Sequence, residues 1–160
     1  MIKSDFEIRK ANLSDAKQLG KLYVDFWKVH KEIDPLLQFK KRITLKNQVR
    51  SAKKDLKSKD SYVFVAQKDE KVVGLIELLL DENDSSYKVK KYGYINSAIT
   101  HKNYRNQGVA KALTNHSIKF LRGKGIKYLR ANVYNSNTTA MKAWTKLGFQ
   151  PQSTMLFRKI

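Results

Sequence analysis

Hydrophobic residues alternate with polar ones in some stretches of the chain and recur every three or four positions in others. Residues 6–11 alternate, which is typical of a strand with one buried face. The next segment has an apolar stripe at helical spacing, made of Ala16, Leu19, Leu22, Tyr23, Phe26 and Trp27. Asn12 and Asp15 resemble the capping pair of a helix start, and Pro35 is expected to end this helix.

A second amphipathic helix with a very basic outer face is expected over residues 39–56. Its apolar positions are Phe39, Ile43, Val49, Ala52 and Leu56. The runs 61–66 and 72–80 flank the turn "KDEK" and therefore predict a β-hairpin. A further strand is expected over residues 91–100.

Helices and strands alternate in the remainder of the chain. Two helical stripes are present: Val109, Leu113, Ser117 and Phe120, then Ala140, Met141, Trp144 and Leu147. Strands are expected over residues 126–134 and 154–160. The predicted order is strand, two helices, three strands, helix, strand, helix, strand.

This order predicts an α/β fold with a central mixed β-sheet and helices on both faces. The strands at 91–100 and 126–134 should be parallel with a right-handed crossover, because a helix connects them. The strands at 61–80 should be antiparallel. With 160 residues and no repeat or linker, the chain is expected to form a single domain over residues 1–160.

Composition excludes several kinds of site. The chain has no cysteine, which excludes a disulfide framework, a thiol nucleophile and a cysteine-ligated zinc site, and we expect no bound metal. No stretch is long and apolar enough to span a membrane, and "MIKSDFEIRKA" lacks the apolar core of a signal peptide. We therefore expect a cytoplasmic protein that has no membrane partner.

The net charge of +19 predicts attraction to polyanions such as nucleic acid or a phosphorylated cofactor. It also fits a protein kept soluble by lysine. The second interpretation is favoured, because the lysines are scattered over every segment and no aromatic RNA-binding signature is present.

Residues 101–113, "HKNYRNQGVAKAL", place a basic, polar loop directly before a helix. The first N–H groups of a helix lack partners and attract anions, phosphates above all. Gly108 would let a phosphate approach the backbone closely, and Ala110 keeps the helix start uncrowded. Neither a P-loop nor a dinucleotide fingerprint occurs here. Taken alone, the pattern also fits an ordinary strand-to-helix turn.

The loop resembles the acetyl-CoA signature Q/R-x-x-G-x-G/A of the GCN5-related N-acetyltransferases. "YGYINSAITHKNYRNQGVAKAL" (92–113) resembles that family's fourth strand, loop and third helix. "NSNTTAMKAWTKLGF" (135–149) resembles the exit of its fifth strand and its fourth helix. The predicted order of elements also matches the family's fold. The N-terminal third, which usually shapes the acceptor pocket, matches only in pattern.

The resemblance implies that acetyl-CoA is the cosubstrate. The backbone of Ala98, Ile99 and Thr100 is expected to pair with the pantetheine arm, with an N–H near Ile99 or Thr100 facing the thioester carbonyl. Pyrophosphate binding is expected from the loop residues Arg105, Asn106, Gln107, Gly108, Val109 and Ala110. Asn137 matches an asparagine that commonly contacts the cofactor, and it is equally suited to cap its helix.

The resemblance supplies no standard acid–base pair. Relatives often have a glutamate where this chain has Asn96 or Asn132, and a tyrosine where it has Trp144. Indole has no proton to donate at neutral pH, so Trp144 is interpreted as a core aromatic. The residues that could act instead as general base or acid are Glu77, Tyr134 and Tyr94. Each also fits a structural role, with Glu77 facing solvent and the tyrosines packing, and catalysis without a strong protein base is a further option.

The predicted function is acetyl transfer from acetyl-CoA to a primary amine on a small molecule, a polyamine, a peptide or a protein. Acidic residues at Asp34, Glu77 and 81–84 are expected to attract a cationic acceptor. Two alternatives remain: a non-catalytic acyl-CoA-binding module, and a nucleic-acid- or ribosome-associated protein. The identity of the acceptor stays open, as does a homodimer of the kind frequent in the family.

Overall fold

The computed structural model describes residues 6–34, 36 and 42–160. Five strands form one sheet whose spatial order follows the chain. They are β1 (Glu7–Lys10), β2 (Ser61–Lys68), β3 (Lys71–Glu82), β4 (Lys91–Thr100) and β5 (Leu129–Ala131). Neighbouring strands are antiparallel, except that β5 lies parallel to β4.

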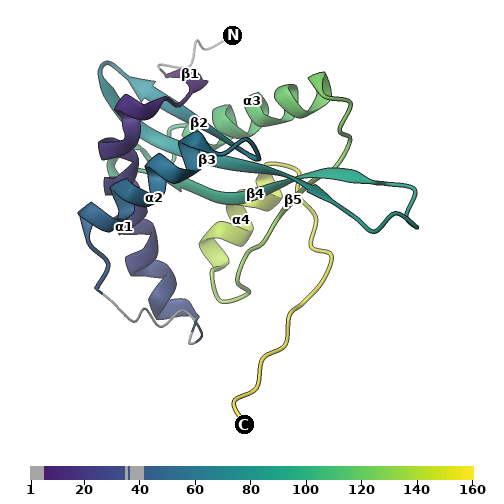
Figure 1. Cartoon of the computed structure of the whole chain (residues 1–160). Coiled ribbons are helices and arrows are strands. Elements are labelled where there is room, and N and C mark those ends of the chain that lie inside the picture. The colour runs from purple at the N-terminus through teal and green to yellow at the C-terminus, as the bar shows by residue number, and fades with distance from the viewer. Residues whose placement is uncertain (1–5, 35, 37–41) are drawn as a thin grey trace.

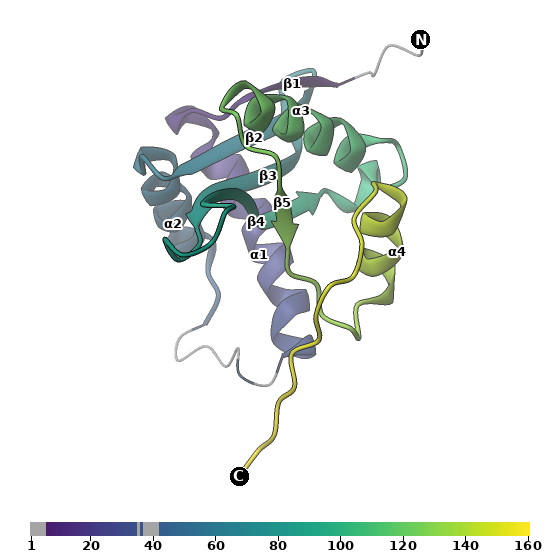
Figure 2. The ribbon, with the colours of Figure 1, turned by 90° about the vertical axis from the view of Figure 1, so that its right-hand side faces the viewer.

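Helices cover both faces of this sheet (Figures 1 and 2). One face carries α1 (Ala16–Ile33) and α2 (Leu45–Lys57), and the other carries α3 (Val109–Gly123) and α4 (Thr138–Lys146). The predicted α/β class and mixed sheet are confirmed. No helix in the described part of the chain is long and apolar enough to cross a membrane.

Two apolar clusters, one on each face, hold the layers together. Leu19 and Leu22 of α1 pack with Leu75 and Ile99 of the sheet. On the opposite face, α3 and the sheet share a second cluster that includes Phe64, Ile76, Leu78, Ile95 and Leu113. The alternation of the strands produces this division, because successive side chains point to opposite faces.

The predicted capping pair starts a short 3-10 helix, η1 (Leu13–Asp15), that leads directly into α1. The Asn12 side chain accepts a hydrogen bond from the Ser14 N–H at 2.9 Å, and Asp15 accepts one from the Asn12 N–H at 2.8 Å. Arg9 on β1 also donates two hydrogen bonds of 2.8 Å to the Asp15 carboxylate. This contact lowers the pKa of Asp15 and ties the first strand to the first helix.

The β2–β3 hairpin is confirmed, and its turn includes Asp69 in the left-handed region at φ 53°. The second helix begins at Leu45, because the Thr44 hydroxyl accepts a hydrogen bond from the Asn47 N–H at 3.2 Å. Two earlier predictions, the helix stop at Pro35 and the apolar position Phe39, lie outside the described residues.

A bulge interrupts the pairing of β3 with β4. Glu77 lies opposite Ser97, whereas the next residue, Leu78, lies opposite Ile95. Asn96 is therefore the extra residue on β4. A bulge bends its strand and increases the local twist, which turns β4 away from its other neighbour.

The predicted strand over residues 126–134 is too long. Only Leu129–Ala131 pairs with β4, opposite Gly93 to Ile95. Pairing ends where the bulge begins, so the chain beyond Ala131 has no strand to follow. Asn132 and Tyr134 consequently lie in the connection to α4 and not on a strand.

The predicted closing strand over residues 154–160 does not form. These residues have no regular structure, and Met155 and Leu156 are 87% and 89% exposed. Figure 1 shows the segment extending away from the sheet. Its alternating pattern favours a strand, but a strand also needs a neighbour to which its backbone can hydrogen-bond.

The close approach of α1 and α2 predicts a strong size limit at Gly20. A Cβ there would lie 2.6 Å from Val49 Cγ2 and 3.0 Å from the Val49 backbone nitrogen. Gly20→Leu should lower the free energy of unfolding by about 2 kcal/mol or more in denaturant titrations. Gly123→Ala is the control, because nothing lies within 4 Å of its Cβ position. It should be neutral or stabilising by up to about 1 kcal/mol, and equal losses in both variants would contradict the packing.

Candidate functional site

The second half of β4 has an open backbone edge. β5 pairs with β4 only as far as Ile95, and beyond it no strand of the described residues pairs with β4 on that side. His101 donates its N–H to the Val73 carbonyl at 2.9 Å. Alternation along the strand therefore directs the N–H and C=O groups of Thr100 and Ala98 to the open edge. The N–H and C=O groups of Ile99 point to β3. Of the two N–H groups considered for the thioester carbonyl, only that of Thr100 therefore points to the open edge.

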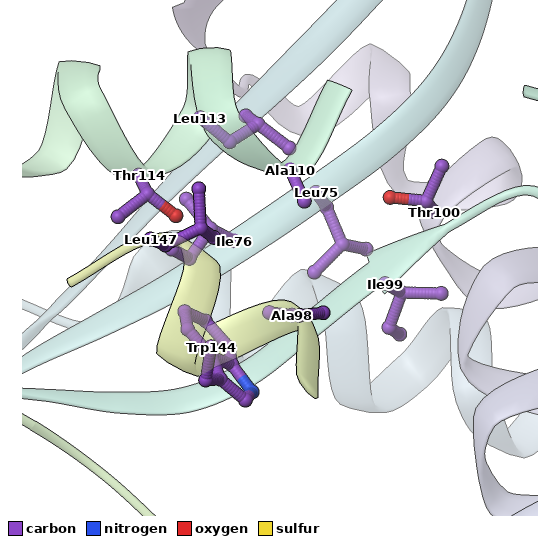
Figure 3. A pocket seen from close by; sticks show the side chains of 11 residues that line it. Leu75, Ile76, Ala98, Ile99, Thr100, Ala110, Leu113, Thr114, Trp144 and Leu147 are labelled. Atoms are coloured by element: carbon purple, nitrogen blue, oxygen red, sulfur yellow. The ribbon is translucent and has the colours of Figure 1, made fainter. Parts of the chain in front are cut away.

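A cavity of about 120 Å³ lies between this edge and helices α3 and α4 (Figure 3). It is lined by Leu75, Ile76, Ala98, Ile99, Thr100, Ala110, Leu113, Thr114, Ala143, Trp144 and Leu147. In Figure 3, Ala98 of β4 and Trp144 of α4 lie on the same side of this space. The lining is mostly apolar and thus suits an extended, largely uncharged chain.

The loop before α3 has the backbone shape of an anion site. Asn106 and Gly108 both have positive φ angles, 60° and 85°, and Gly108 is the residue that precedes the helix. Nothing lies within 4 Å of the Cβ position of Gly108. The N–H groups of the first turn, from Val109 onward, have no partner within the helix. Successive N–H groups in such a turn converge on one point.

Side chains hold this loop in place and add positive charge. Gln107 donates to the Asn103 carbonyl at 2.9 Å, and Arg105 donates to the Thr100 carbonyl at 3.4 Å. The pKa of His101 is lowered, first by burial and then by the charge of Lys71, with Arg105 adding to the effect. Cations thus gather at the end of β4, where an anion would also meet the positive end of α3.

Asn137 caps α4. Its side-chain oxygen accepts a hydrogen bond from the Ala140 N–H at 3.1 Å, and its own N–H donates to the Tyr134 carbonyl at 2.8 Å. The capping role is confirmed. Contact with a cofactor stays a prediction, since the cavity lining named above does not include Asn137.

Glu77 is buried on the α1–α2 face of the sheet. It is 4% exposed, so the expectation that it faces solvent is wrong. Its carboxylate accepts hydrogen bonds from Asn96 at 2.8 Å and from Ser97 and Ser61 at 3.1 Å each. The bulge explains this arrangement, because it brings two successive β4 side chains to the same carboxylate. Asn96 itself is exposed and connects the buried acid to the surface.

Two further polar groups surround Glu77. Tyr23 of α1 is 5% exposed, and its pKa is raised by burial and by the negative charge of Glu77. Asp55 of α2 is half-buried, and burial followed by the charge of Glu77 raises its pKa to about 6. Sequence reasoning missed these residues and the two serines. The apolar stripes of α1 and α2 were visible, but the packing of the two helices onto β3 was not.

Tyr134 makes a different contact from the one expected of a proton donor. Its hydroxyl donates to the Asp34 carboxylate at 2.6 Å, which raises the pKa of Tyr134 to about 12 and lowers that of Asp34. The hydrogen bond joins the end of α1 to the connection after β5. His30 lies beside it, stacked on Phe26 with ring centroids 3.7 Å apart.

Tyr94 is half-buried on β4, paired with Leu79 and Arg130 on the neighbouring strands. It is close enough to Tyr134 to contribute to the raised pKa of that residue. Trp144 packs against Phe149 with centroids 4.9 Å apart while lining the cavity. Among the described residues, no group of three or more histidine, cysteine, aspartate or glutamate side chains could hold a metal ion.

Residues 18–149 match the model of the acetyltransferase (GNAT) family. The chain belongs to this family. The open edge of β4, the loop before α3 and the cavity between them are thus features of a GNAT protein. No curated protein sequence matches the chain.

Solved structures resemble this GNAT chain at low sequence identity, which shows the fold alone. A mutant of the BH1408 protein from Bacillus halodurans is 18% identical with a TM-score of 0.85, covering 96% of this chain and 99% of that one. Aminoglycoside N-acetyltransferase AAC(6')-Iy, in complex with CoA, is 17% identical with a TM-score of 0.76, covering 97% and 94%. Aminoglycoside acetyltransferase meta-AAC0020 from an uncultured soil metagenomic sample, in complex with sisomicin, is 19% identical with a TM-score of 0.73, covering 100% and 99%.

The hydrogen bond at the start of α4 predicts a stability loss at Asn137. Asn137→Ala removes the acceptor for the Ala140 N–H and should lower the free energy of unfolding by about 1 kcal/mol. Asn137→Asp retains an acceptor and should largely restore it. Denaturant titration measures both, and CoA titration of the same variants tests the cofactor contact. Loss of stability at unchanged CoA affinity would assign Asn137 to capping only.

Proposed function

We propose that the chain is an acetyl-CoA-dependent N-acetyltransferase that acetylates a primary amine. The observation that supports this best is the placement of three features around one bulge. The open edge of β4 lies on one side of Asn96, and the buried carboxylate of Glu77 lies on its other side. A loop whose backbone is shaped to bind an anion follows the strand. An acetyltransferase needs a cofactor groove that reaches a group able to accept a proton.

The residues present fit the cofactor. The loop from Arg105 to Ala110 would bind the pyrophosphate through backbone N–H groups and the Arg105 charge. The backbone of Ala98 and Thr100 would pair with the pantetheine arm, and the apolar cavity would enclose it. Acetyl-CoA supplies an activated acetyl group whose thiol, with a pKa near 8.5, leaves easily.

An acceptor amine would approach from the α1–α2 face. Glu77, Asp55 and Asp34 gather negative charge there, in a chain whose net charge is +19, and favour a cationic acceptor. The similarity to aminoglycoside acetyltransferases supports a small-molecule amine as the acceptor class. The hydrogen-bonded Tyr134 keeps its proton and would position the acceptor, with Tyr94 beside it.

Glu77 is the proposed general base. A protonated amine must lose a proton before it attacks, and the exposed Asn96 links Glu77 to the surface. Hydrogen bonds from Asn96, Ser97 and Ser61 hold the carboxylate in a fixed position. The arrangement therefore favours Glu77 over a mechanism without a protein base.

Cofactor binding is tested first. CoA or acetyl-CoA should raise the melting temperature by an amount set by its concentration over its dissociation constant. Gly108→Val should remove this shift, because valine is strained at φ 85° and its side chain would cover the N–H groups. Gly125→Val is the matched control, since it adds similar strain, at φ 73°, beyond the other end of α3. An unchanged melting temperature at saturating CoA would refute the proposed function.

The role of Glu77 predicts a pH effect. Glu77→Gln should lower kcat/KM at least a hundredfold and remove the acidic limb of its pH profile. Glu70→Gln changes an exposed glutamate in the β2–β3 turn and should have no effect. Amines of different pKa should share one acidic limb in the wild-type enzyme. A limb that follows each amine's own titration, with only a few-fold loss in Glu77→Gln, would instead show catalysis without a protein base.

A non-catalytic acyl-CoA-binding module is the alternative, since the positions of the family's usual acids hold Asn96, Asn132 and Trp144. Incubation of the protein with labelled acetyl-CoA and a panel of amines distinguishes the enzyme from the non-catalytic module. Binding of CoA with no acetylated product from any amine would favour the module.

A further inference from the structure

The cavity between β4, α3 and α4 contains a buried hydroxyl group, that of Thr114 on α3. Thr114 is 1% exposed, and its Oγ1 atom has no hydrogen-bond partner among the described residues. In Figure 3 this oxygen points toward Leu147 and Ile76, which line the same cavity. Leaving a buried hydroxyl without a partner costs free energy, so the group indicates a place where a ligand supplies the partner.

Local helix geometry does not explain the orientation of this hydroxyl. Ser117 of α3 donates to the Leu113 carbonyl at 3.0 Å, and Thr145 of α4 donates to the Met141 carbonyl at 2.9 Å. A threonine in a helix can reach the carbonyl of the preceding turn in this way, because two χ1 rotamers are open to it. Thr114 makes no such bond within the described structure.

The cavity offers few partners to a water molecule. Of the described residues that line it, only Thr100, Thr114 and Trp144 have polar side chains. A buried water typically makes about three hydrogen bonds and therefore needs polar groups on several sides. A ligand with an apolar body and a few polar groups fits this lining better.

The position of Thr114 along α3 indicates which part of a ligand it would meet. Thr114 lies about 7.5 Å along the helix axis from Val109, the first residue of α3. A diphosphate bound at the first turn would place the next few bonds of its substituent at this depth. In CoA those bonds lead to the first amide group of the pantetheine arm.

Helix α4 forms one wall of the cavity and can adjust to a ligand. It has no buried residue, and of its lining residues Ala143 is exposed while Trp144 and Leu147 are half-buried. A small shift of such a helix uncovers little additional apolar surface. The adjustment is needed, because the Thr114 oxygen is covered in the free protein.

We propose that the Thr114 hydroxyl binds the first amide of the pantetheine arm by donating a hydrogen bond to its carbonyl oxygen. The proposal rests on the proposed function and adds a side-chain contact to a groove otherwise formed by backbone and apolar groups. The hydroxyl is unsatisfied in the free protein and gains its partner when the arm enters. Thr114 thus favours a cosubstrate that has the arm over a nucleotide that lacks it.

The melting temperature of the free protein is the first measurement. Thr114→Val keeps the shape of the side chain and removes the unsatisfied hydroxyl, so it should raise the melting temperature by roughly 1–4 °C. Ser117→Ala is the matched control, because it removes a hydroxyl of the same helix that is hydrogen-bonded. It should not raise the melting temperature. No rise in Thr114→Val would show that the hydroxyl is satisfied without a ligand and would overturn the proposal.

Calorimetric titration is the second measurement. Thr114→Val should weaken CoA binding about three- to tenfold, and Thr114→Ser, which keeps the hydroxyl, should restore most of the affinity. The nucleotide part of CoA, without the pantetheine arm, should bind wild type and Thr114→Val equally well. Ser117→Ala should change neither affinity. An unchanged affinity for CoA in Thr114→Val, or an equal loss for CoA and for the nucleotide, would overturn the contact.

Failure of the proposed function gives a different result. A protein that binds CoA through Thr114 but acetylates no amine would refute the acetyltransferase and support the contact. A wild-type protein that does not bind CoA would refute both.

Discussion

A single extra residue on β4 determines the geometry of the site. Because Asn96 is inserted opposite β3, the strand twists and separates from β5 after three paired residues. One consequence is an open backbone edge beside the cavity. The other is that Asn96 and Ser97 both reach the carboxylate of Glu77. A regular strand would have closed the cavity with a longer β5 and would have sent these two side chains to opposite faces.

The charges of the chain are separated along this strand. Lys71 and Arg105 gather with His101 at the end of β4, next to the N-terminal end of α3. Glu77 lies under α1 and α2, and the half-buried Asp55 belongs to α2 itself. The hydrogen-bond donors around Glu77 are neutral. This separation suits a reaction that joins an anionic donor to a cationic acceptor.

Local patterns predicted most of the fold. The stripes of α1 and α3, the capping pair at Asn12 and the β2–β3 hairpin depend on neighbours in sequence, and each was found where expected. The closing strand over 154–160 and the long fifth strand were not, because a strand forms only where a partner edge exists. The shape of the loop from Arg105 to Ala110 could be expected because it depends on residues that are adjacent in sequence. The environment of Glu77 was not, because Tyr23, Asp55 and Ser61 approach it from three different elements.

The short ladder between β4 and β5 has a dynamic consequence. β5 pairs through three residues, the fewest of any strand in the described sheet. Local opening takes the least free energy where the fewest backbone hydrogen bonds and apolar contacts must break. The pairing of β5 with β4 is therefore the part of the described sheet that opens most readily. A long, flexible ligand can enter sideways between two strands while the paired core of β2 and β3 stays intact.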